Sequence, residues 1–328
     1  MTKVLGIGNA LVDALIMLEN DSLITELGFP KGSMQLVDEK TSASIKEKSQ
    51  HLDKEMASGG SAANTIHGLA RLGIETAFIG TIGEDETGNF FQNDLEKSKI
   101  KPLLKISKTP SGIANTMISK DGERTFGTFL GAAIELSGDD LNLEQFDGHD
   151  YLHVEGYLVQ NHDLLENILK LAKQAGLKIS IDMASFNVVE DNLDFLKIMV
   201  DKYVDIIFAN EEEAKAFTGQ EPEEALETLA KQCEIAVVKI GSKGSMIKTG
   251  GKRTDVEAIK TTAVDTTGAG DLYAAGFLYG LIHNLGMKRS GQLGSLLAST
   301  VIEKVGAKIS ESGWKKIERE LALMQGNN

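Results

Sequence analysis

The stretch VDTTGAGDLYAAGFLYG, residues 264–280, changes character in its middle. Its first half carries hydroxyls, glycines and acidic residues, whereas residues 272–280 are almost all apolar or small. This pattern predicts a buried helix that begins near Ala269. Glycines at a helix start let a ligand approach the backbone closely, and the unpaired N–H groups and the helix dipole favour an anion. The first turn of this helix is therefore suited to a phosphate.

An acidic residue, Asp271, lies in that first turn, where a carboxylate would repel a bound phosphate. As a general base, however, it would take the proton of a hydroxyl group whose oxygen attacks phosphorus, while the N–H groups hold the charge of the transferred group. The structural alternative is that Asp271 complements the helix dipole and that the glycines only turn the chain. The motif alone leaves both interpretations open.

A second helix start has a similar composition, in SGGSAANTIHGLARLG at residues 58–73. Gly59 and Gly60 expose backbone, Ser61 suits an N-cap, and Asn64 falls on the first turn of an apolar helix. The amide of Asn64 can donate to and accept from the hydroxyls of a small ligand. An ordinary helix start would look the same, but two such starts in one domain indicate a cleft for two substrates.

Short β-branched runs alternate with helical patterns along most of the chain. The runs are apolar on both faces, which is typical of parallel strands covered by helices. They predict an α/β fold with a doubly wound, mainly parallel sheet and a ligand site beyond the carboxyl ends of its strands. The predicted strands are residues 3–8, 76–83, 151–158, 178–183, 204–210 and 235–241, and the predicted helices are 61–72, 86–98, 163–175, 190–200, 211–218, 223–232, 269–284, 288–305 and 312–324.

Two regions interrupt this alternation, at about residues 11–38 and 103–130. Both contain period-2 segments separated by turn residues such as KDGE at 120–123. Paired with each other, they are expected to form a small sheet inserted into a single domain that spans residues 1–328. A small sheet over the carboxyl edge of the main sheet would act as a lid.

The composition limits the class of partner. A formal net charge of −14 argues against nucleic acid or an anionic membrane, so a phosphate site must be built locally. Cys233 is the only cysteine, which excludes an intrachain disulfide and a multi-cysteine zinc site. Asp13 interrupts the apolar N-terminus, and no apolar run reaches the ~18 residues of a membrane span. We expect a cytoplasmic protein with a small-molecule substrate.

The two motifs GGSAANTIHGLARLG and DTTGAGDLYAAGFLYGL resemble the signatures of the PfkB carbohydrate kinases, the family of ribokinase, fructokinase and adenosine kinase. The resemblance covers about residues 4–321. It implies a Rossmann-like, ribokinase-like domain with a β lid, which transfers the γ-phosphate of ATP to a primary hydroxyl of a sugar or nucleoside. It also implies that Asp271 is the catalytic base and that the N–H groups of Gly268, Ala269 and Gly270 form an anion hole.

The resemblance further implies the contacts of the acceptor substrate. Asp13 matches an acidic residue that binds neighbouring sugar hydroxyls, and Gly59, Gly60 and Asn64 match the other sugar contacts. Asp13 follows the first predicted strand and so lies at the expected ligand edge, which independently favours a role in substrate binding. A loop cap is the structural alternative.

The nucleotide and its metal are implied by two further segments. Asn210 and Glu213 match an N-x-x-E motif that organises Mg²⁺, usually through water, and they also form a capping pair at a strand-to-helix junction. VKIGSKGSMI, which contains Lys239, resembles the segment whose glycines, here Gly241 and Gly244, lie along ATP. A strand followed by a hairpin turn explains that segment almost as well.

A monovalent cation, potassium, is the last group that the resemblance implies. Asp265 and Thr267 match its first contacts, and KVGAKIS at residues 304–310 matches the later segment. Thr267 also adjoins the expected phosphate site.

The acceptor is expected to be a nucleoside such as adenosine. Residues 23–39 resemble the lid segment of adenosine kinases and would place Met34 and Leu36 over a flat apolar base, while Tyr157 can stack on a purine. Packing of the lid and core is the alternative for these three residues. A phosphorylated sugar would need more cations near the lid than Arg124 clearly provides.

Two other functions remain as alternatives. One is a sugar kinase of the ribokinase or fructokinase type, and the other is a non-catalytic nucleoside- or sugar-binding protein on the same fold. Asp271 speaks against the second, because a sensor needs no base. The sequence leaves a monomer and a homodimer paired through the lid equally open.

Overall fold

The computed structural model describes residues 2–326, and its main sheet has nine strands in the order β14-β13-β12-β11-β10-β9-β1-β5-β6. Neighbouring strands from β6 to β12 run parallel, while β13 and β14 extend the sheet in antiparallel fashion. The predicted doubly wound α/β sheet is thereby confirmed. The strands are β1 (Lys3–Ile7), β5 (Glu75–Gly83), β6 (Ile100–Ser107), β9 (Tyr151–Glu155), β10 (Lys178–Asp182), β11 (Ile206–Asn210), β12 (Ile235–Lys239), β13 (Ser245–Thr249) and β14 (Lys252–Val256).

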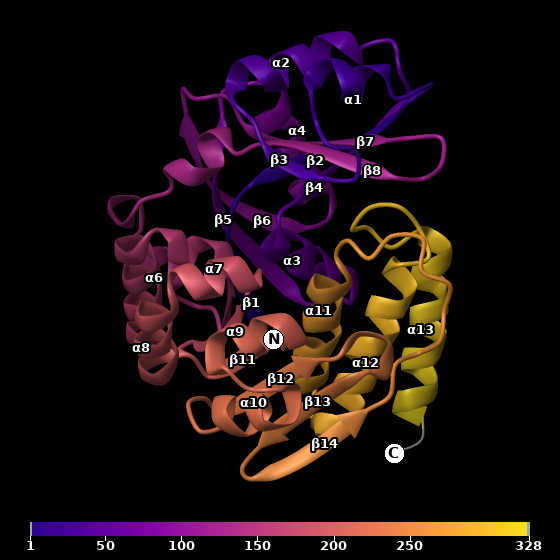
Figure 1. The fold of residues 1–328 in the computed structure, drawn as a ribbon. Helices are drawn as coiled ribbons and strands as arrows, with labels where there is room; N and C mark the ends of the chain where they lie inside the picture. Colours follow the sequence, from indigo (N-terminus) through magenta and orange to yellow (C-terminus); the bar gives the residue numbers. More distant parts are fainter. Residues whose placement is uncertain (1, 327–328) are drawn as a thin grey trace.

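Helices cover both faces of the main sheet, and each face has its own apolar core (Figure 1). Successive strand residues alternate between the cores, as Ile207 faces one and Phe208 the other. On one face lie α5 (Leu143–Phe146), α6 (His162–Gln174), α7 (Phe186–Asp191), α8 (Leu193–Tyr203), α9 (Glu211–Thr218) and α10 (Pro222–Leu229). On the other lie α3 (Ser61–Arg71), α4 (Glu86–Lys97), α11 (Ala269–Ile282), α12 (Gly286–Val301) and α13 (Glu311–Gly326).

Helix α11 is the buried helix that the stretch 264–280 predicts, and every residue from Leu272 to Gly280 is buried. Its glycines let α12 approach closely. A Cβ on Gly276 would lie 2.5 Å from the carbonyl oxygen of Leu293, and one on Gly280 would lie 2.5 Å from Ser290 Oγ. The packing of α11 between the sheet and α12 fixes where its first turn, with Asp271, meets the rest of the molecule.

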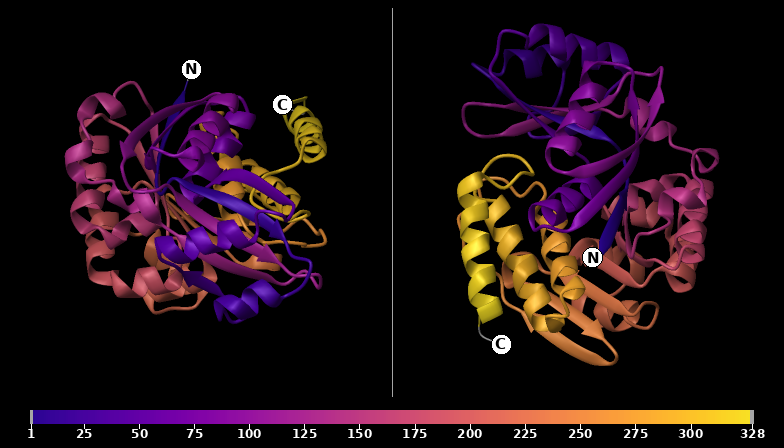
Figure 2. Two further views of the ribbon diagram at one scale, coloured as in Figure 1. Left: turned by 90° about the horizontal axis from the view of Figure 1, so that it is seen from above. Right: turned by 180° about the vertical axis from the view of Figure 1, so that it is seen from behind.

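The second sheet has five strands in the order β3-β8-β7-β2-β4. It lies at one end of the molecule, with two helices on its outer side (Figures 1 and 2). A third, smaller core between these helices and the sheet contains Ile16, Ile24 and Met117. The elements are β2 (Leu11–Met17), α1 (Ser22–Leu27), β3 (Met34–Leu36), α2 (Glu39–Lys48), β4 (Lys54–Gly59), β7 (Gly112–Ile118) and β8 (Arg124–Phe129).

The membership of the small sheet differs from the expected segments 11–38 and 103–130 in two respects. Residues 100–107 form β6, which pairs with β5 at the edge of the main sheet. An edge strand is partly exposed to solvent, so its sequence can alternate between apolar and polar residues. A strand of a small sheet shows the same alternation. Conversely, the polar segment 54–59 forms β4, which pairs with β2.

Several boundaries also differ from the predictions; the helix expected at 288–305, for example, is α12 and ends at Val301. The strand expected at 151–158 ends at Glu155, because residues 156–160 form a 3₁₀ turn. The helix expected at 190–200 is replaced by α7 and α8, which meet at Asn192. Within residues 2–326, no helix is both long and apolar enough to cross a membrane.

The single cysteine lies between α10 and β12, where it is half-buried and its thiol contacts two backbone carbonyl groups. Cys233 Sγ is 3.3 Å from the carbonyl oxygen of Leu229 and 3.2 Å from that of Ile235. Burial raises the pKa of Cys233 to about 12, so the thiol stays protonated and unreactive at neutral pH.

The close packing of α11 on α12 predicts the effect of Gly276→Ala. Helix propensity alone would favour alanine by about 1 kcal/mol. The added methyl, however, overlaps the backbone of Leu293, so we expect the free energy of unfolding to fall by about 1–3 kcal/mol. Thermal and urea unfolding measure this change. Gln292→Ala, on the exposed side of α12, is the matched control, and a Gly276→Ala protein as stable as this control would contradict the packing account.

Candidate active site

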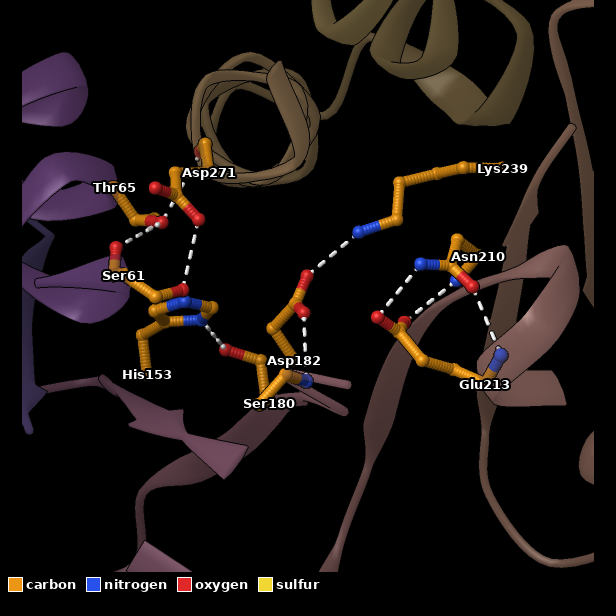
Figure 3. Close-up of polar contacts among 10 residues, drawn as sticks. Ser61, Thr65, His153, Ser180, Asp182, Asn210, Glu213, Lys239 and Asp271 are labelled. Carbon is orange, nitrogen blue, oxygen red and sulfur yellow. Dashed lines mark hydrogen bonds and ion pairs between the residues drawn. The ribbon is translucent and has the colours of Figure 1, made fainter. Parts of the chain in front are cut away.

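Four neighbouring strands of the main sheet end in polar residues. Glu155 ends β9 opposite Asp182 at the end of β10, and Asn210 ends β11 opposite Lys239 at the end of β12. The first turns of α3 and α11 meet this edge (Figure 3). The carboxyl edge of the parallel sheet therefore gathers polar and charged groups from six elements, at the position where α/β sheets bind ligands.

The Asp271 carboxylate joins the two helix starts that the sequence singles out. Ser61 Oγ donates to Asp271 Oδ1 at 2.8 Å, and Asn64 Nδ2 donates to Oδ2 at 3.0 Å. The Thr65 hydroxyl donates to the backbone carbonyl of Asp271 at 3.1 Å (Figure 3). Ser61 is not the N-cap that we expected, because Gly60 takes that position with a φ of 94° and Ser61 turns toward Asp271.

Burial raises the pKa of Asp271 to about 6, and the negative charge of Asp182 acts in the same direction. The hydrogen bonds from Asn64 and Ser61 and the charge of Lys239 oppose this rise. Asp271 is therefore ionised at neutral pH and is more basic than an exposed aspartate. Such a group can act as a general base near pH 7.

The expected anion hole lies directly before Asp271. Gly268 is the N-cap of α11 with a φ of 76°, and the first N–H groups of the helix have no acceptor within it. The Ala269 N–H donates to the carbonyl oxygen of Thr266 at 3.2 Å, a long hydrogen bond. Lys239 Nζ lies 3.0 Å from where a Cβ of Gly270 would be, so an ammonium group adjoins this helix start.

Lys239 also pairs with an acidic residue that the sequence analysis missed. Its Nζ lies 2.7 Å from Asp182 Oδ2, and Asp182 is only 6% exposed. Burial lowers the pKa of Lys239, but the negative charges of Asp182, Glu213 and Asp271 outweigh it and raise the pKa overall. The position of this acidic residue near the carboxyl end of the predicted strand 178–183, at the expected ligand edge, was the signal that could have revealed it.

Asn210 and Glu213 form the capping pair that their spacing predicts. Glu213 accepts from the Asn210 backbone N–H and from Asn210 Nδ2, both at 2.7 Å, and the Glu213 N–H donates to Asn210 Oδ1 at 2.8 Å. Burial raises the pKa of Glu213 to about 7, and the charge of Asp182 adds to the effect.

The oxygen donors of Asp182 and Glu213 fit a magnesium ion in chemical type. Both oxygens of Glu213 already accept hydrogen bonds, so this carboxylate would hold the ion through water. Within residues 2–326, no three histidine, cysteine or acidic side chains are grouped so as to bind a metal directly. Few direct protein ligands are typical of magnesium that arrives with a nucleotide.

Asp13, on β2, lies against Gly59, where any side chain would overlap its carboxylate. Burial raises the pKa of Asp13 to about 6, whereas Lys308 opposes this shift. Lys308 is a second residue that sequence reasoning missed. Burial lowers the pKa of Lys308 to about 8, while the negative charges of Asp94, Asp13 and Asp271 oppose this shift. Lys308 therefore supplies positive charge close to the carboxylates of Asp13 and Asp271.

Glu155 holds the start of α3 in place. Its carboxylate accepts from Asn9 Nδ2 at 2.8 Å and from the Ala62 N–H at 3.2 Å, and a Cβ on Gly60 would overlap the carbonyl oxygen of Asn9. Burial raises the pKa of Glu155 to about 7. The fixed start of α3 in turn places Ser61 against Asp271.

The remaining expected residues lie around this centre. Met34 and Leu36, on β3, are 60% and 66% exposed, so the structure does not pack them against Asp271. Gly241 is exposed, and Gly244 is a glycine because a side chain would overlap the backbone of residues 256–258. The hairpin-turn interpretation therefore accounts for Gly244.

Tyr157 and the expected potassium contacts have partners from the chain itself. Burial raises the pKa of Tyr157, and the nearby side chain of Ser185 opposes this rise. Asp265 and Thr267 both pair with Arg124 at the start of β8.

Comparison with known proteins identifies the family of this chain. Residues 33–313 match the model of the pfkB family carbohydrate kinases. The chain belongs to this family. Membership of this family and similarity to kinases identify the pfkB protein as a phosphotransferase that acts on a hydroxyl group of a sugar or nucleoside. The predicted family, fold class and enzyme class are confirmed.

Relatives of this pfkB kinase include both sugar and nucleoside kinases. An uncharacterised sugar kinase of Archaeoglobus fulgidus is 32% identical over 252 residues, covering 74% of this chain and 96% of that protein. A ribokinase of Haemophilus influenzae is 27% identical, covering 78% and 84%. The crystal structure of adenosine kinase from Sinorhizobium meliloti has a TM-score of 0.85 at 31% identity, covering 97% and 99%.

The raised pKa of Asp271 predicts a pH-dependent gain in stability for Asp271→Asn. A carboxyl group whose folded pKa is about 6, above the ordinary 3.8, loses stabilisation as the pH rises through 6. We therefore expect the asparagine variant to be more stable than the parent at pH 7, by up to about 3 kcal/mol, and the gain to vanish near pH 4. Thermal unfolding at several pH values measures the gain. Asp201→Asn, on the exposed side of α8, serves as control, and an equal gain at both pH values would contradict the prediction.

Proposed function

We propose that this protein transfers the γ-phosphate of ATP to a primary hydroxyl of a nucleoside such as adenosine. One observation carries the proposal. A buried, basic carboxylate, Asp271, projects from the first turn of α11 and is held by Ser61 and Asn64, while the N–H groups and Lys239 beside it present positive charge. A base for an alcohol and a site for the transferred phosphoryl group are thus parts of one turn.

In the proposed reaction, Asp271 takes the proton of the acceptor hydroxyl as its oxygen attacks the γ-phosphorus. The new O–P bond forms while the bond from γ-phosphorus to the bridging oxygen breaks, and ADP leaves. The N–H groups of Gly268, Ala269 and Gly270 hold the charge on the transferred group. The Ala269 N–H must give up its long hydrogen bond to Thr266 to take part.

The acceptor is proposed to lie between Asp13 and Asn64. Asn64 is 5% exposed, and its Oδ1 has no hydrogen-bond partner among the described residues, so it can accept from a hydroxyl of the acceptor. The Asp13 carboxylate, close to the backbone of Gly59, can accept from two neighbouring hydroxyls. A ribose ring offers such a pair together with a primary hydroxyl.

The base of a nucleoside is proposed to contact the small sheet, which would then act as the lid. Met34 and Leu36 expose apolar side chains there. The similarity over almost the whole chain to adenosine kinase from Sinorhizobium meliloti supports a nucleoside. The sugar-kinase relative from Archaeoglobus fulgidus supports the alternative, a sugar acceptor.

ATP is proposed to lie along the ends of β11 and β12. Lys239 would approach its phosphates after parting from Asp182, and Gly241 leaves backbone open beside them. Asp182 and Glu213 would hold magnesium through water. The metal, when bound, neutralises phosphate charge and thereby favours the transfer.

Asp271→Asn tests the proposed base. The variant should bind the acceptor and ATP with affinities close to those of the parent, whereas kcat should fall by about 10²–10⁴-fold. In the parent, kcat should fall as the pH drops below about 6, because the carboxylate must be ionised. Coupled measurement of ADP release and calorimetric binding separate the two effects. Turnover that survives the substitution would overturn the assignment of the base.

A panel of acceptors tests the proposed substrate class. Release of ADP is measured with adenosine, other nucleosides, ribose and fructose, and we expect the highest kcat/KM with adenosine. Asp13→Asn should raise KM for the acceptor by about 10–100-fold, since a charged hydrogen bond is worth ~1.5–3 kcal/mol. Asp53→Asn, before β4, is the control. Preference for ribose or fructose would favour the sugar kinase, and binding without turnover would favour a sensor.

A further inference from the structure

The pair Asp265 and Thr267 lies in the loop that leads into α11, where the family resemblance implies a monovalent cation. In the structure a side chain from the small sheet reaches this place. Arg124 Nη1 donates to Asp265 Oδ1 and, at 2.9 Å, to Thr267 Oγ1. The Asp265 side chain is 2% exposed, and that of Arg124 is 24% exposed. The ion pair is therefore shielded from most of the solvent.

The remaining groups around Asp265 are donors as well. The Thr267 N–H donates to Asp265 Oδ1 at 2.8 Å, and the Gly306 N–H donates to Oδ2 at 2.8 Å. Gly306 belongs to the segment 304–310 that should supply later contacts of the cation, but it turns its N–H toward the carboxylate. A potassium site needs oxygen atoms that converge on a common centre, whereas this carboxylate is surrounded by N–H groups and a guanidinium.

Two nearby contacts, one of a carbonyl oxygen and one of an aromatic ring, also argue against a potassium site. The carbonyl oxygen of Ile302 accepts from the N–H groups of Val264 and Asp265, at 2.7 and 3.3 Å. The Arg124 guanidinium lies 5.7 Å from the ring centre of Phe126, which helps to orient it. The residues present do not fit a monovalent cation.

We propose that the Arg124 guanidinium takes the place of the monovalent cation, so that the protein works without potassium. The inference rests on the proposed kinase function. Arg124 acts as a positioning residue: it neutralises Asp265, and Asp265 holds the Thr267 N–H immediately before the N-cap Gly268. The shape of the anion hole then depends on a residue of β8, so the small sheet and the phosphate site are coupled through one ion pair.

The first test compares chlorides of potassium, sodium and choline at about 0.1 M, where the screening length is about 10 Å. Melting temperature without substrates and the rate of ADP release with the best acceptor are both measured. The parent should show the same melting temperature in all three salts, and rates that agree within about twofold. A potassium-specific rise in melting temperature, or a parent rate that collapses in choline, would overturn the proposal.

The second test uses Arg124→Ala. In choline chloride its kcat should fall by about 10–100-fold, the loss expected for a charged hydrogen bond. Potassium or free guanidinium should restore a large part of kcat, and potassium should now raise the melting temperature. Arg124→Lys should retain more activity than the alanine variant in choline. Lys120→Ala, in the exposed turn between β7 and β8, is the matched control and should match the parent.

Other outcomes separate the possible errors. If Arg124→Ala raises KM for ATP and no cation relieves the defect, Arg124 clamps phosphate and the proposal is overturned. If no acceptor is phosphorylated, the kinase function has failed. The melting temperatures of the parent and of Arg124→Ala then still decide whether the arginine replaces a cation.

Discussion

The arrangement of the site depends on the buried carboxylate of Asp271. A negative charge in this position needs donors, and they come from α3, a helix more than two hundred positions away in the sequence, through Ser61 and Asn64. This requirement joins the first turns of two helices that cover the same face of the main sheet. The close packing of α11 on α12 keeps the carboxylate there, although its burial is unfavourable for stability.

Charge balance connects this centre with its surroundings. The ammonium group of Lys239 lies among three carboxylates, those of Asp182, Glu213 and Asp271. Burial and the negative charge of Asp182 raise the pKa of Glu213 and of Asp271. The positive charge of Lys308 partly balances the negative charge of Asp13, and the positive charge of Arg124 balances that of Asp265. The free site therefore combines fixed cations with carboxylates that are easily protonated.

The sequence predicted the central elements well because they obey simple rules. Strands that are buried on both faces, such as β10 and β11, are continuous apolar runs, and the glycine-rich starts of α3 and α11 mark the two sides of the site. Edge strands were harder to place. β4 has too few apolar residues to stand out, and the partly exposed β6 carries the same alternation as a strand of the small sheet. Asp182 had a signal in its position near the end of a predicted strand, whereas Glu155 and Lys308 were missed because long-range contacts give them their environment.

The half-buried thiol of Cys233 has a practical consequence for studying this kinase. A half-buried thiol whose pKa is raised forms little of the reactive thiolate, so we expect Cys233 to react slowly with maleimide or iodoacetamide reagents. A cysteine engineered into the turn between β7 and β8 would then be the one site that takes up a dye. Fluorescence from that dye could report whether the small sheet moves when ligands bind.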